Sequence, residues 1–262
     1  MEISSRISTS AMLAHQRQLD VISNNIANQG TTAFKRSRAN LTDIGYQAGI
    51  NAPVGPNGAT VRIEGVGEGV ELSDIKADFV PGNAQPTGSG LDIALNGEGF
   101  LSVAMPGGAV GYTRDGSLHV DNNGLLVTAG GLPLRSTTGE PIQLPAEATA
   151  ARIDENGQLI ATVNGEEAAV GQLGLARFTN SQGLLANGQN IWLATPASGA
   201  AQAVQAGAPG APGIIPGALE GSNVDIADEF TRMMAAQRGY QMNLKVVQAW
   251  DEIGRMANEL RR

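Results

Sequence analysis

The sequence contains no cysteine and only two histidines, His15 and His119, in 262 residues. Without thiols the protein cannot use cysteine nucleophiles, disulfides or thiolate metal ligands, and two histidines are too few for a multi-histidine metal centre. Aromatic residues make up 4% and charged residues 16% of the chain, and average proteins are roughly 25% charged. We therefore expect no metal and no cofactor.

Positive charge and long apolar runs are also scarce. The formal net charge is −8, whereas a nucleic-acid-binding protein needs a basic surface and aromatic stacking platforms, so we expect no nucleic-acid partner. No apolar run approaches the roughly 18 residues of a transmembrane helix, which predicts no membrane insertion. The first residues lack the basic and apolar regions of a cleaved secretory signal, so export would use another route.

Glycine and proline, 35 and 12 in number, are concentrated between residues 30 and 221. Residues 1–29 contain neither, and residues 222–262 contain two glycines and no proline. This distribution predicts a helix at each end and turn-rich β structure between them. The expected fold class is α+β, with the N- and C-terminal helices paired as a coiled coil and a central, mainly antiparallel β domain.

Both end segments carry apolar residues at helical spacing, mostly in steps of three and four, which is the coiled-coil period of 3.5. The N-terminal stripe consists of Ile7, Met12, Leu19, Ile22 and Ile26. The C-terminal stripe consists of Ile226, Phe230, Met233, Tyr240, Leu244, Val247, Trp250 and Ile253. We expect these residues to form subunit interfaces. The alternative is a monomer whose two helices form one hairpin on the β body.

The helix ends also have local signals. Asn28-Gln29-Gly30 ends the first helix, because glycine suits the left-handed position after the last turn. Ser222-Asn223-Val224-Asp225 matches a capping box, so we expect Ser222 and Asp225 each to accept a free amide at the start of the second helix. Gly239 and Gly254 lie within the C-terminal helical pattern, where they indicate either a close helix approach or a weak point of the helix, since glycine costs about 1 kcal/mol relative to alanine. His15 lies on the N-terminal apolar stripe, so we expect it to be a core or interface residue.

The middle of the chain contains repeated turn signals. Asp115-Gly116 and Asn164-Gly165 are typical of two-residue hairpin turns. Residues 119–128 and 152–161 share an apolar residue, Asp, one variable residue and Asn-Gly, which predicts a strand, a tight turn and a returning strand. The strand candidates are 91–95, 99–105, 109–113, 117–121, 125–129, 151–153, 158–163, 172–179 and 191–195.

Composition divides the chain into five segments. They are an N-terminal helix (1–30), a connecting segment (31–70), a β-rich body (71–195), a return segment rich in Gly, Pro and Ala (196–221) and a C-terminal helix (222–262).

No residue set has the pattern of a catalytic or metal site. His119 follows Asp115 and Ser117, but all three belong to one predicted hairpin, where side chains alternate between faces. Asp121 and Asp154 precede Asn-Gly turns, and turn geometry explains them without the further ligands of a calcium loop. We therefore expect no catalytic, cofactor-binding or metal residue and no enzymatic activity.

Lys35, Arg36 and Arg38 form the basic cluster of the chain. A polyanion-binding patch needs more adjacent cations and stacking aromatics than this segment offers. We expect the cluster to be solvated or to face an interface.

Four blocks of the sequence resemble the bacterial flagellar rod and hook protein family. They are LDVISNNIANQGTTAFKRSRANLTDIGYQ (19–47), LDIALNGEGFLSV (91–103), GYTRDGSLHVDNNGLLVTAGGLPL (111–134) and LEGSNVDIADEFTRMMAAQRGYQMN (219–243). Their order matches the family, although Ala33 and Leu101 stand where Gly and Phe are more common. The total length and the segment from Tyr46-Gln47 are most similar to distal-rod members of the family.

The resemblance implies a structural subunit of the flagellar basal body. Copies would polymerise helically into a hollow distal rod that transmits torque from motor to hook, with the paired helices inside and the β domain outside. The implied partners are further copies of this chain, other rod proteins, the hook protein and the surrounding ring proteins. The implied location is the periplasmic space, reached by type III export without a cleaved signal peptide.

The resemblance also implies a rod-type insertion within residues 48–64 that wedges between subunits and stiffens the tube. The residues carried over to this role are Ile50, Pro53, Pro56 and Arg62.

Two alternative functions of the chain stay open. One is another rod protein of the same family, from the proximal rod. The other is a secreted carbohydrate-binding or hydrolytic β-domain protein, which would need a cleft with poised carboxylates.

Overall fold

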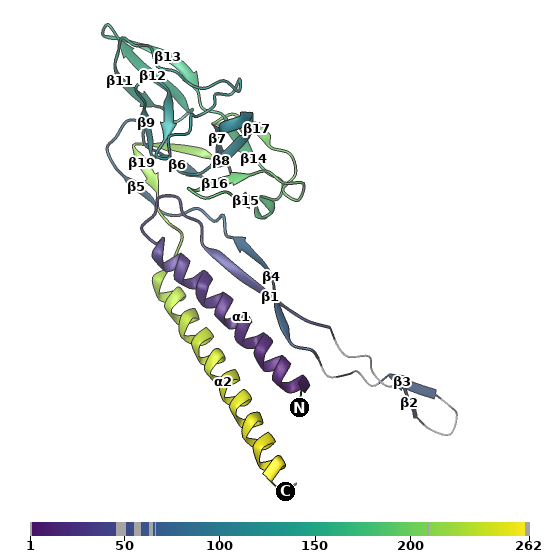
Figure 1. Ribbon diagram of the computed structural model, residues 1–262. Coiled ribbons are helices and arrows are strands. Elements are labelled where there is room, and N and C mark those ends of the chain that lie inside the picture. The colour runs from purple at the N-terminus through teal and green to yellow at the C-terminus, as the bar shows by residue number, and fades with distance from the viewer. Residues whose placement is uncertain are drawn as a thin grey trace. The chain divides into compact units, whose positions relative to one another are not determined.

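The computed structural model of the protein (Figure 1) describes residues 2–45, 51–54, 59–62, 65, 67–208 and 210–259. The chain forms two compact units. Unit 1 comprises Met1–Ala27, Ser37–Lys76 and Asp225–Arg262, and unit 2 comprises Asn28–Arg36 and Ala77–Val224. Helices at both ends and mainly antiparallel strands between them confirm the α+β class.

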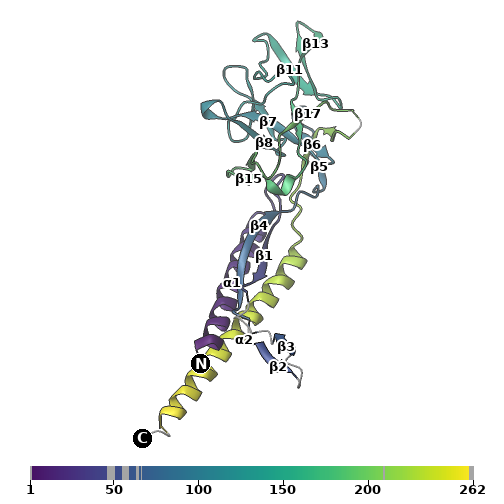
Figure 2. The same ribbon diagram turned by 90° about the vertical axis from the view of Figure 1, so that its right-hand side faces the viewer.

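Unit 1 contains the two long helices, α1 (Glu2–Ala27) and α2 (Ile226–Glu259). They lie side by side in both views and run antiparallel, with the two termini at the same end of the pair (Figures 1 and 2). The less exposed positions of α2 recur mostly in steps of three and four, which is the spacing of a helix face packed along a neighbour. Among the described side chains of α2 they are Asp228, Glu229, Met233, Ala236, Gly239, Tyr240, Asn243, Val247, Trp250 and Gly254.

The described residues of the same unit also form two strand pairs. β1 (Ser37–Asp43) pairs with β4 (Val70–Ala77), and β1 also contacts α1. β2 (Asn51–Val54) pairs antiparallel with β3 (Ala59–Arg62).

Unit 2 is built from short strands and two 3-10 turns, η1 (Pro106–Gly108) and η2 (Ser181–Gly183). Its strands are β5 (Ala84–Pro86), β6 (Ile93–Asn96), β7 (Phe100–Ala104), β8 (Val110–Thr113), β9 (Leu118–Val120), β10 (Leu126–Thr128), β11 (Ala148–Ile153), β12 (Gln158–Val163), β13 (Glu166–Gln172), β14 (Leu175–Arg177), β15 (Leu185–Ala186), β16 (Ile191–Leu193), β17 (Gln202–Val204), β18 (Gly213–Pro216) and β19 (Ala218–Glu220).

The largest sheet among the described residues has the order β15-β16-β8-β7-β14-β17, and each neighbouring pair is antiparallel. A three-stranded antiparallel sheet has the order β11-β12-β13. Three further antiparallel pairs join β9 to β10, β6 to β18 and β5 to β19. The last two pairs bring the return segment back along the start of the β body.

Strand β7 separates two apolar cores, because successive side chains of a strand point to opposite faces. Leu101 is fully buried in an aliphatic core with residues such as Leu126 and Leu159. Its neighbour Phe100 belongs to an aromatic cluster and packs edge-to-face on Phe178, with ring centroids 5.7 Å apart. Burial on both faces makes β7 the structural centre of unit 2.

The turn predictions have mixed outcomes. Asn164 and Gly165, both with positive φ, connect the paired strands β12 and β13, which confirms the predicted two-residue turn. Asp115-Gly116 does not form a hairpin turn, because β8 pairs with β7 and β16 whereas β9 pairs with β10. Gly116 is required there for another reason: a Cβ atom would overlap the carbonyl oxygen of Ile93.

Candidate functional site

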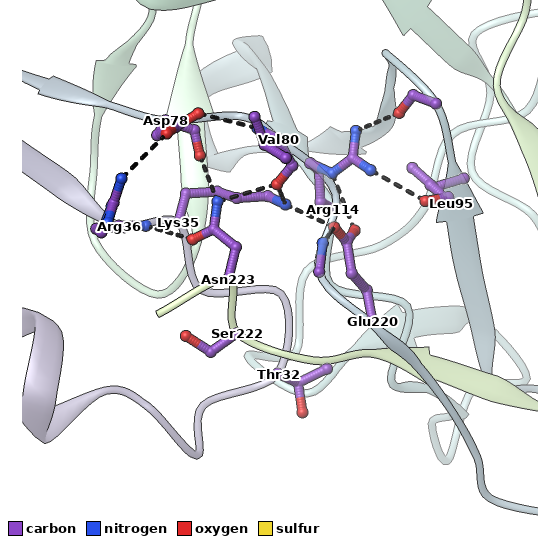
Figure 3. A network of polar contacts seen from close by, with 12 residues as sticks. Thr32, Lys35, Arg36, Asp78, Val80, Leu95, Arg114, Glu220, Ser222 and Asn223 are labelled. Carbon is purple, nitrogen blue, oxygen red and sulfur yellow. Dashed lines mark hydrogen bonds and ion pairs between the residues drawn. The ribbon is translucent and has the colours of Figure 1, made fainter. Parts of the chain in front are cut away.

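Three charged side chains are buried together in unit 2: Lys35, Arg114 and Glu220. At most 1% of each side chain is exposed. Lys35 Nζ donates to Glu220 Oε1 and to the carbonyl oxygen of Val80, the latter at 2.9 Å. Arg114 Nε donates to Glu220 Oε2 at 2.9 Å. Figure 3 shows that the carboxylate lies between the two cations. We call these three residues the ion network.

Backbone groups complete the ion network. The two terminal nitrogens of Arg114 donate to the carbonyl oxygens of Leu95, Gly97 and Gly99, at 2.8 to 3.0 Å. The amide of Gly82 donates to Glu220 Oε1 at 2.9 Å. Within the described part of the chain, no buried side-chain nitrogen or oxygen lacks a hydrogen-bond partner. The desolvation cost of the three charges is therefore offset by directed contacts.

The electrostatics of the network are unbalanced, because two cations share one carboxylate. Burial, followed by repulsion from Arg114, lowers the pKa of Lys35 from its ordinary value of 10.5. The prediction of a solvated or interface-facing basic cluster is wrong for Lys35. Its side chain is turned into unit 2, where it reaches a carboxylate 185 residues later in the sequence.

Neighbouring backbone segments are tied together around the network. The amide of Ala33 donates to the carbonyl oxygen of Glu220 at 2.7 Å, and the amide of Arg36 donates to Asn223 Oδ1 at 2.7 Å. Asn223 Nδ2 donates to the carbonyl oxygen of Asp78 at 2.8 Å (Figure 3). The amide of Asp78 in turn donates to the carbonyl oxygen of Arg36 at 2.8 Å. Residues 33–36, 78–82 and 220–223 thus form one cluster, which we call the exit collar.

A second polar link lies in unit 1 and uses Asn25 from the Asn-rich block after Leu19. Asn25 Nδ2 donates to Glu229 Oε2 of α2 at 3.1 Å and to the carbonyl oxygen of Ser37 at 2.9 Å. The amide of Ser37 donates back to Asn25 Oδ1 at 2.9 Å. One buried asparagine therefore joins α1, β1 and α2.

The two helices approach closely at Gly239. A Cβ atom on this residue would lie 2.5 Å from Nε2 of His15, and His15 Nδ1 contacts Gln18 Oε1 at 3.1 Å. The glycine therefore makes room for the imidazole. His15 is part of the helix contact, in agreement with the sequence prediction.

The predicted C-terminal stripe separates into two sets in the structure. Ile226, Phe230, Leu244 and Ile253 are between 38% and 49% exposed. Met233, Tyr240, Val247 and Trp250 are half-buried. The N-terminal set is less exposed: Ile7, Met12, Leu19 and Ile26 are half-buried and Ile22 is buried. The predicted residues therefore include both a covered face and an uncovered face.

Sequence reasoning missed several exposed apolar side chains on the same helices. They are Leu13, Met234, Met242 and Met256. Because they fall outside a single 3.5-residue stripe, periodicity alone did not select them. They widen the apolar surface that the two helices leave uncovered.

The residues proposed for the stiffening insertion are only partly described. Pro53 belongs to β2 and Arg62 to β3, which pair with each other. Ile50 and Pro56 lie outside the described residues.

The turn carboxylates have structural roles. Asp121 Oδ1 accepts the amides of Asn123 and Leu125, and Asp154 Oδ1 accepts those of Asn156 and Gln158.

In the described ranges, no three His, Asp or Glu residues are grouped as a metal site would require. No described helix combines the length and apolarity needed to cross a bilayer.

Three family models match the chain. The flagella basal body rod protein model matches residues 6–35, the flagellar hook protein FlgE/F/G D1 domain model matches residues 94–161, and the flagellar basal body rod FlgEFG protein C-terminal model matches residues 215–260. The matches cover most of α1, the middle of the β body and α2.

Several relatives that match nearly the whole chain carry the name flagellar basal-body rod protein FlgG. The protein of Caulobacter vibrioides is 36% identical, with 98% of each chain covered. That of Buchnera aphidicola subsp. Acyrthosiphon pisum is 35% identical, with 97% of this chain and 98% of the relative covered. That of Bacillus subtilis is 37% identical, with 93% of each chain covered.

Proposed function

The chain belongs to the flagellar basal-body rod protein family and is a structural subunit of the distal rod, and we propose that its copies polymerise through the apolar helix surfaces that each copy leaves uncovered. The observation that carries this proposal is the exposure of Phe230, Leu244 and Ile253 on α2. Covering the exposed half of such a side chain contributes on the order of 1 kcal/mol. Several contacts of this size per neighbour would sustain a helical assembly.

The half-buried residues have a different proposed role. Met233, Tyr240, Val247 and Trp250 recur with the spacing that a coiled coil requires, and α1 lies beside α2. We propose that the two helices pair as a coiled coil on the inner side of a hollow tube, with the β body outside. The division of the chain into segments at 30, 70, 195 and 221 belongs to the same proposal.

Partners and position follow from the same proposal. The homopolymer would contact other rod proteins, the hook protein and the surrounding rings of the basal body, within the periplasmic space and after type III export. Residues 48–64, including Pro53 and Arg62, would form the contact that stiffens the rod. The protein would act as a torque-transmitting subunit and not as an enzyme.

Replacing Phe230 by Asp tests the proposed contact surface. The side chain is 49% exposed in the single chain, so the carboxylate stays hydrated and the monomer should fold normally. A neighbouring subunit would bury this charge without a partner, which costs several kcal/mol. We expect loss of swimming and of distal rods in a bacterium whose only copy is Phe230→Asp, while circular dichroism of the purified monomer is unchanged.

The matched control is Thr231→Asp, which places the same charge on the adjacent, exposed and polar position of α2. This variant should swim. Normal swimming of Phe230→Asp would show that the residue faces no neighbouring subunit.

A further inference from the structure

Three of the four places where the chain passes between the units lie in or beside the exit collar. The chain leaves unit 2 after Arg36, re-enters it at Ala77 and leaves it again after Val224. We call these three crossings, in either direction, the exits of unit 2. Each place lies within one or two residues of a collar segment: 33–36, 78–82 or 220–223. The ion network joins these segments to one another and, through Arg114, to the carbonyl groups that follow β6.

We infer that the Lys35–Glu220–Arg114 ion network fixes the three chain exits of unit 2 in one geometry, so that torque passes between the units without a shift of the exits. This inference rests on the proposed role of the chain as a torque-transmitting rod subunit. It assigns a positioning role to three residues whose side chains are at most 1% exposed in the single chain.

The chemistry of the network supports positioning more than stability. Replacing a buried ion network by apolar residues of similar volume is often neutral or stabilising, so stability alone does not require these charges. Apolar contacts are non-directional, and the groups they join can slide. Charge-assisted hydrogen bonds are directional and short. Here they bind Lys35 to Val80 and Glu220, which lie on the other two exits.

The decisive experiment compares amide hydrogen exchange in the full-length wild type and in the triple variant Lys35→Met, Arg114→Met, Glu220→Leu. The reporters are the backbone amides of Ala33, Arg36 and Asp78, which we call the exit amides. Their hydrogen-bond acceptors are not side-chain atoms of the network, so the substitutions do not remove these acceptors directly. We expect these amides to exchange at least about tenfold faster in the variant. Core amides such as Leu126, bonded to Ile142, should change less than about twofold.

The control pair is Arg152→Met with Glu167→Met. It removes an ion pair of unit 2 whose side chains are 50% and 59% exposed, and it should leave the exit amides unchanged. Equal acceleration at exit and core amides in the triple variant would assign the network to global stability and overturn the inference. Unchanged exchange at the exits would overturn it as well.

If the triple variant does not fold, Lys35→Met alone replaces it. This change leaves the balanced pair of Glu220 with Arg114 and removes the contact to Val80. The same selective acceleration at Arg36 and Asp78 is expected, and uniform acceleration again contradicts the inference.

A second readout is swimming in media of low and high viscosity, with the variant as the only copy in the cell. We expect assembled rods, near-normal speed at low viscosity and at least a twofold greater loss of speed than wild type at high viscosity. Selective loosening of the exits with normal swimming under load would refute the role in torque. Phe230→Asp should give the opposite pattern, with absent rods and unchanged exit amides, so failure of the assembly proposal is distinguishable.

Discussion

Single residues build the two related turns of unit 2 by local chemistry. Asp121 and Asp154 each accept the backbone amides two and four residues later. The glycines Gly124 and Gly157 occupy the positive-φ position that these turns require. All of these groups lie within five residues of one another, so the sequence pattern alone predicted the arrangement.

Asp115 gives a prediction with a defined pH dependence. Burial raises the pKa of Asp115, so its ionised form costs stability above that pKa, and the cost disappears as the pH falls below it. Asp115→Asn removes the charge and keeps an acceptor for the amide of Ser117. We expect a higher free energy of unfolding than wild type at pH 7, and a gain that shrinks toward zero at acidic pH, measured by urea titration.

Asp121→Asn is the control with the opposite sign. Hydrogen bonds from backbone amides, first that of Leu125, lower the pKa of Asp121, so the ionised form stabilises the protein at neutral pH. This variant should lose stability at pH 7 and regain parity with wild type as the pH falls. An Asp115→Asn gain that does not depend on pH would contradict the assigned cause.

The ion network could not be predicted by the same reasoning. Lys35 and Glu220 are 185 residues apart, and Arg114 is 106 residues from Glu220. Each residue belongs to a type that is mostly exposed, so burial was not the expected outcome. Only the folded chain brings the three together. Local motifs are therefore readable from sequence where long-range charge pairing is not.

At the scale of elements, the start of α2 corrects the capping prediction. The helix begins at Ile226, and Asp225 Oδ1 accepts the amides of Ala227 and Asp228 at 2.9 and 3.4 Å. Ser222 instead accepts the amide of Val224 before the helix, at 3.3 Å. Asp225 is the N-cap because its carboxylate reaches the first free amides and carries the charge that the helix dipole favours there.

The cap assignment predicts unequal effects of two alanine substitutions. Asp225→Ala should lower the free energy of unfolding of the helical unit by about 1 kcal/mol, the usual cost of losing an N-cap. Ser222→Ala should have a clearly smaller effect. Thermal unfolding followed by far-UV circular dichroism compares them, and a larger effect at Ser222 would restore the original prediction.

Helix packing at Gly239 yields a coupled prediction. Gly239→Ala improves helix propensity by about 1 kcal/mol, but its Cβ would stand 2.5 Å from His15 Nε2. Overpacking of this kind costs about 1–3 kcal/mol. We expect Gly239→Ala to destabilise wild type and to become neutral or stabilising in a His15→Ala background. The four urea unfolding curves of this double-mutant cycle measure the coupling, and additive effects would exclude the contact.

Strand prediction succeeded where the apolar pattern was strong and failed where it was weak. The runs around Leu101 and Leu159 are buried strands, as expected. β13 was missed because Glu166 to Ala169 combine low strand propensity with an exposed face. The Asn164-Gly165 turn contained the missing information, because a hairpin turn after β12 requires a returning strand.

At the scale of the whole molecule, the two units differ in how they are stabilised. Unit 2 contains the aliphatic core and the aromatic cluster. Among the described residues of unit 1, the buried apolar side chains are Ala14, Ile22 and Ala236. Its helices instead expose large apolar residues such as Phe230 and Met242. A unit with so little buried apolar area gains little free energy from folding alone.

This difference predicts a change in protection on assembly. In the free monomer, amides of α1 and α2 should exchange with solvent faster than those of β7 and β8, because unit 1 opens at a lower free energy than unit 2. In assembled rods, neighbouring subunits would cover Phe230 and Leu244, so the helical amides should approach the protection of the β strands. Hydrogen exchange with mass spectrometry on both states measures this, and the Thr231→Asp protein serves as an assembling control. Helices already as protected as β7 in the dilute monomer would mean that the single chain stabilises them without neighbours, and the exposed apolar surface would then need another explanation.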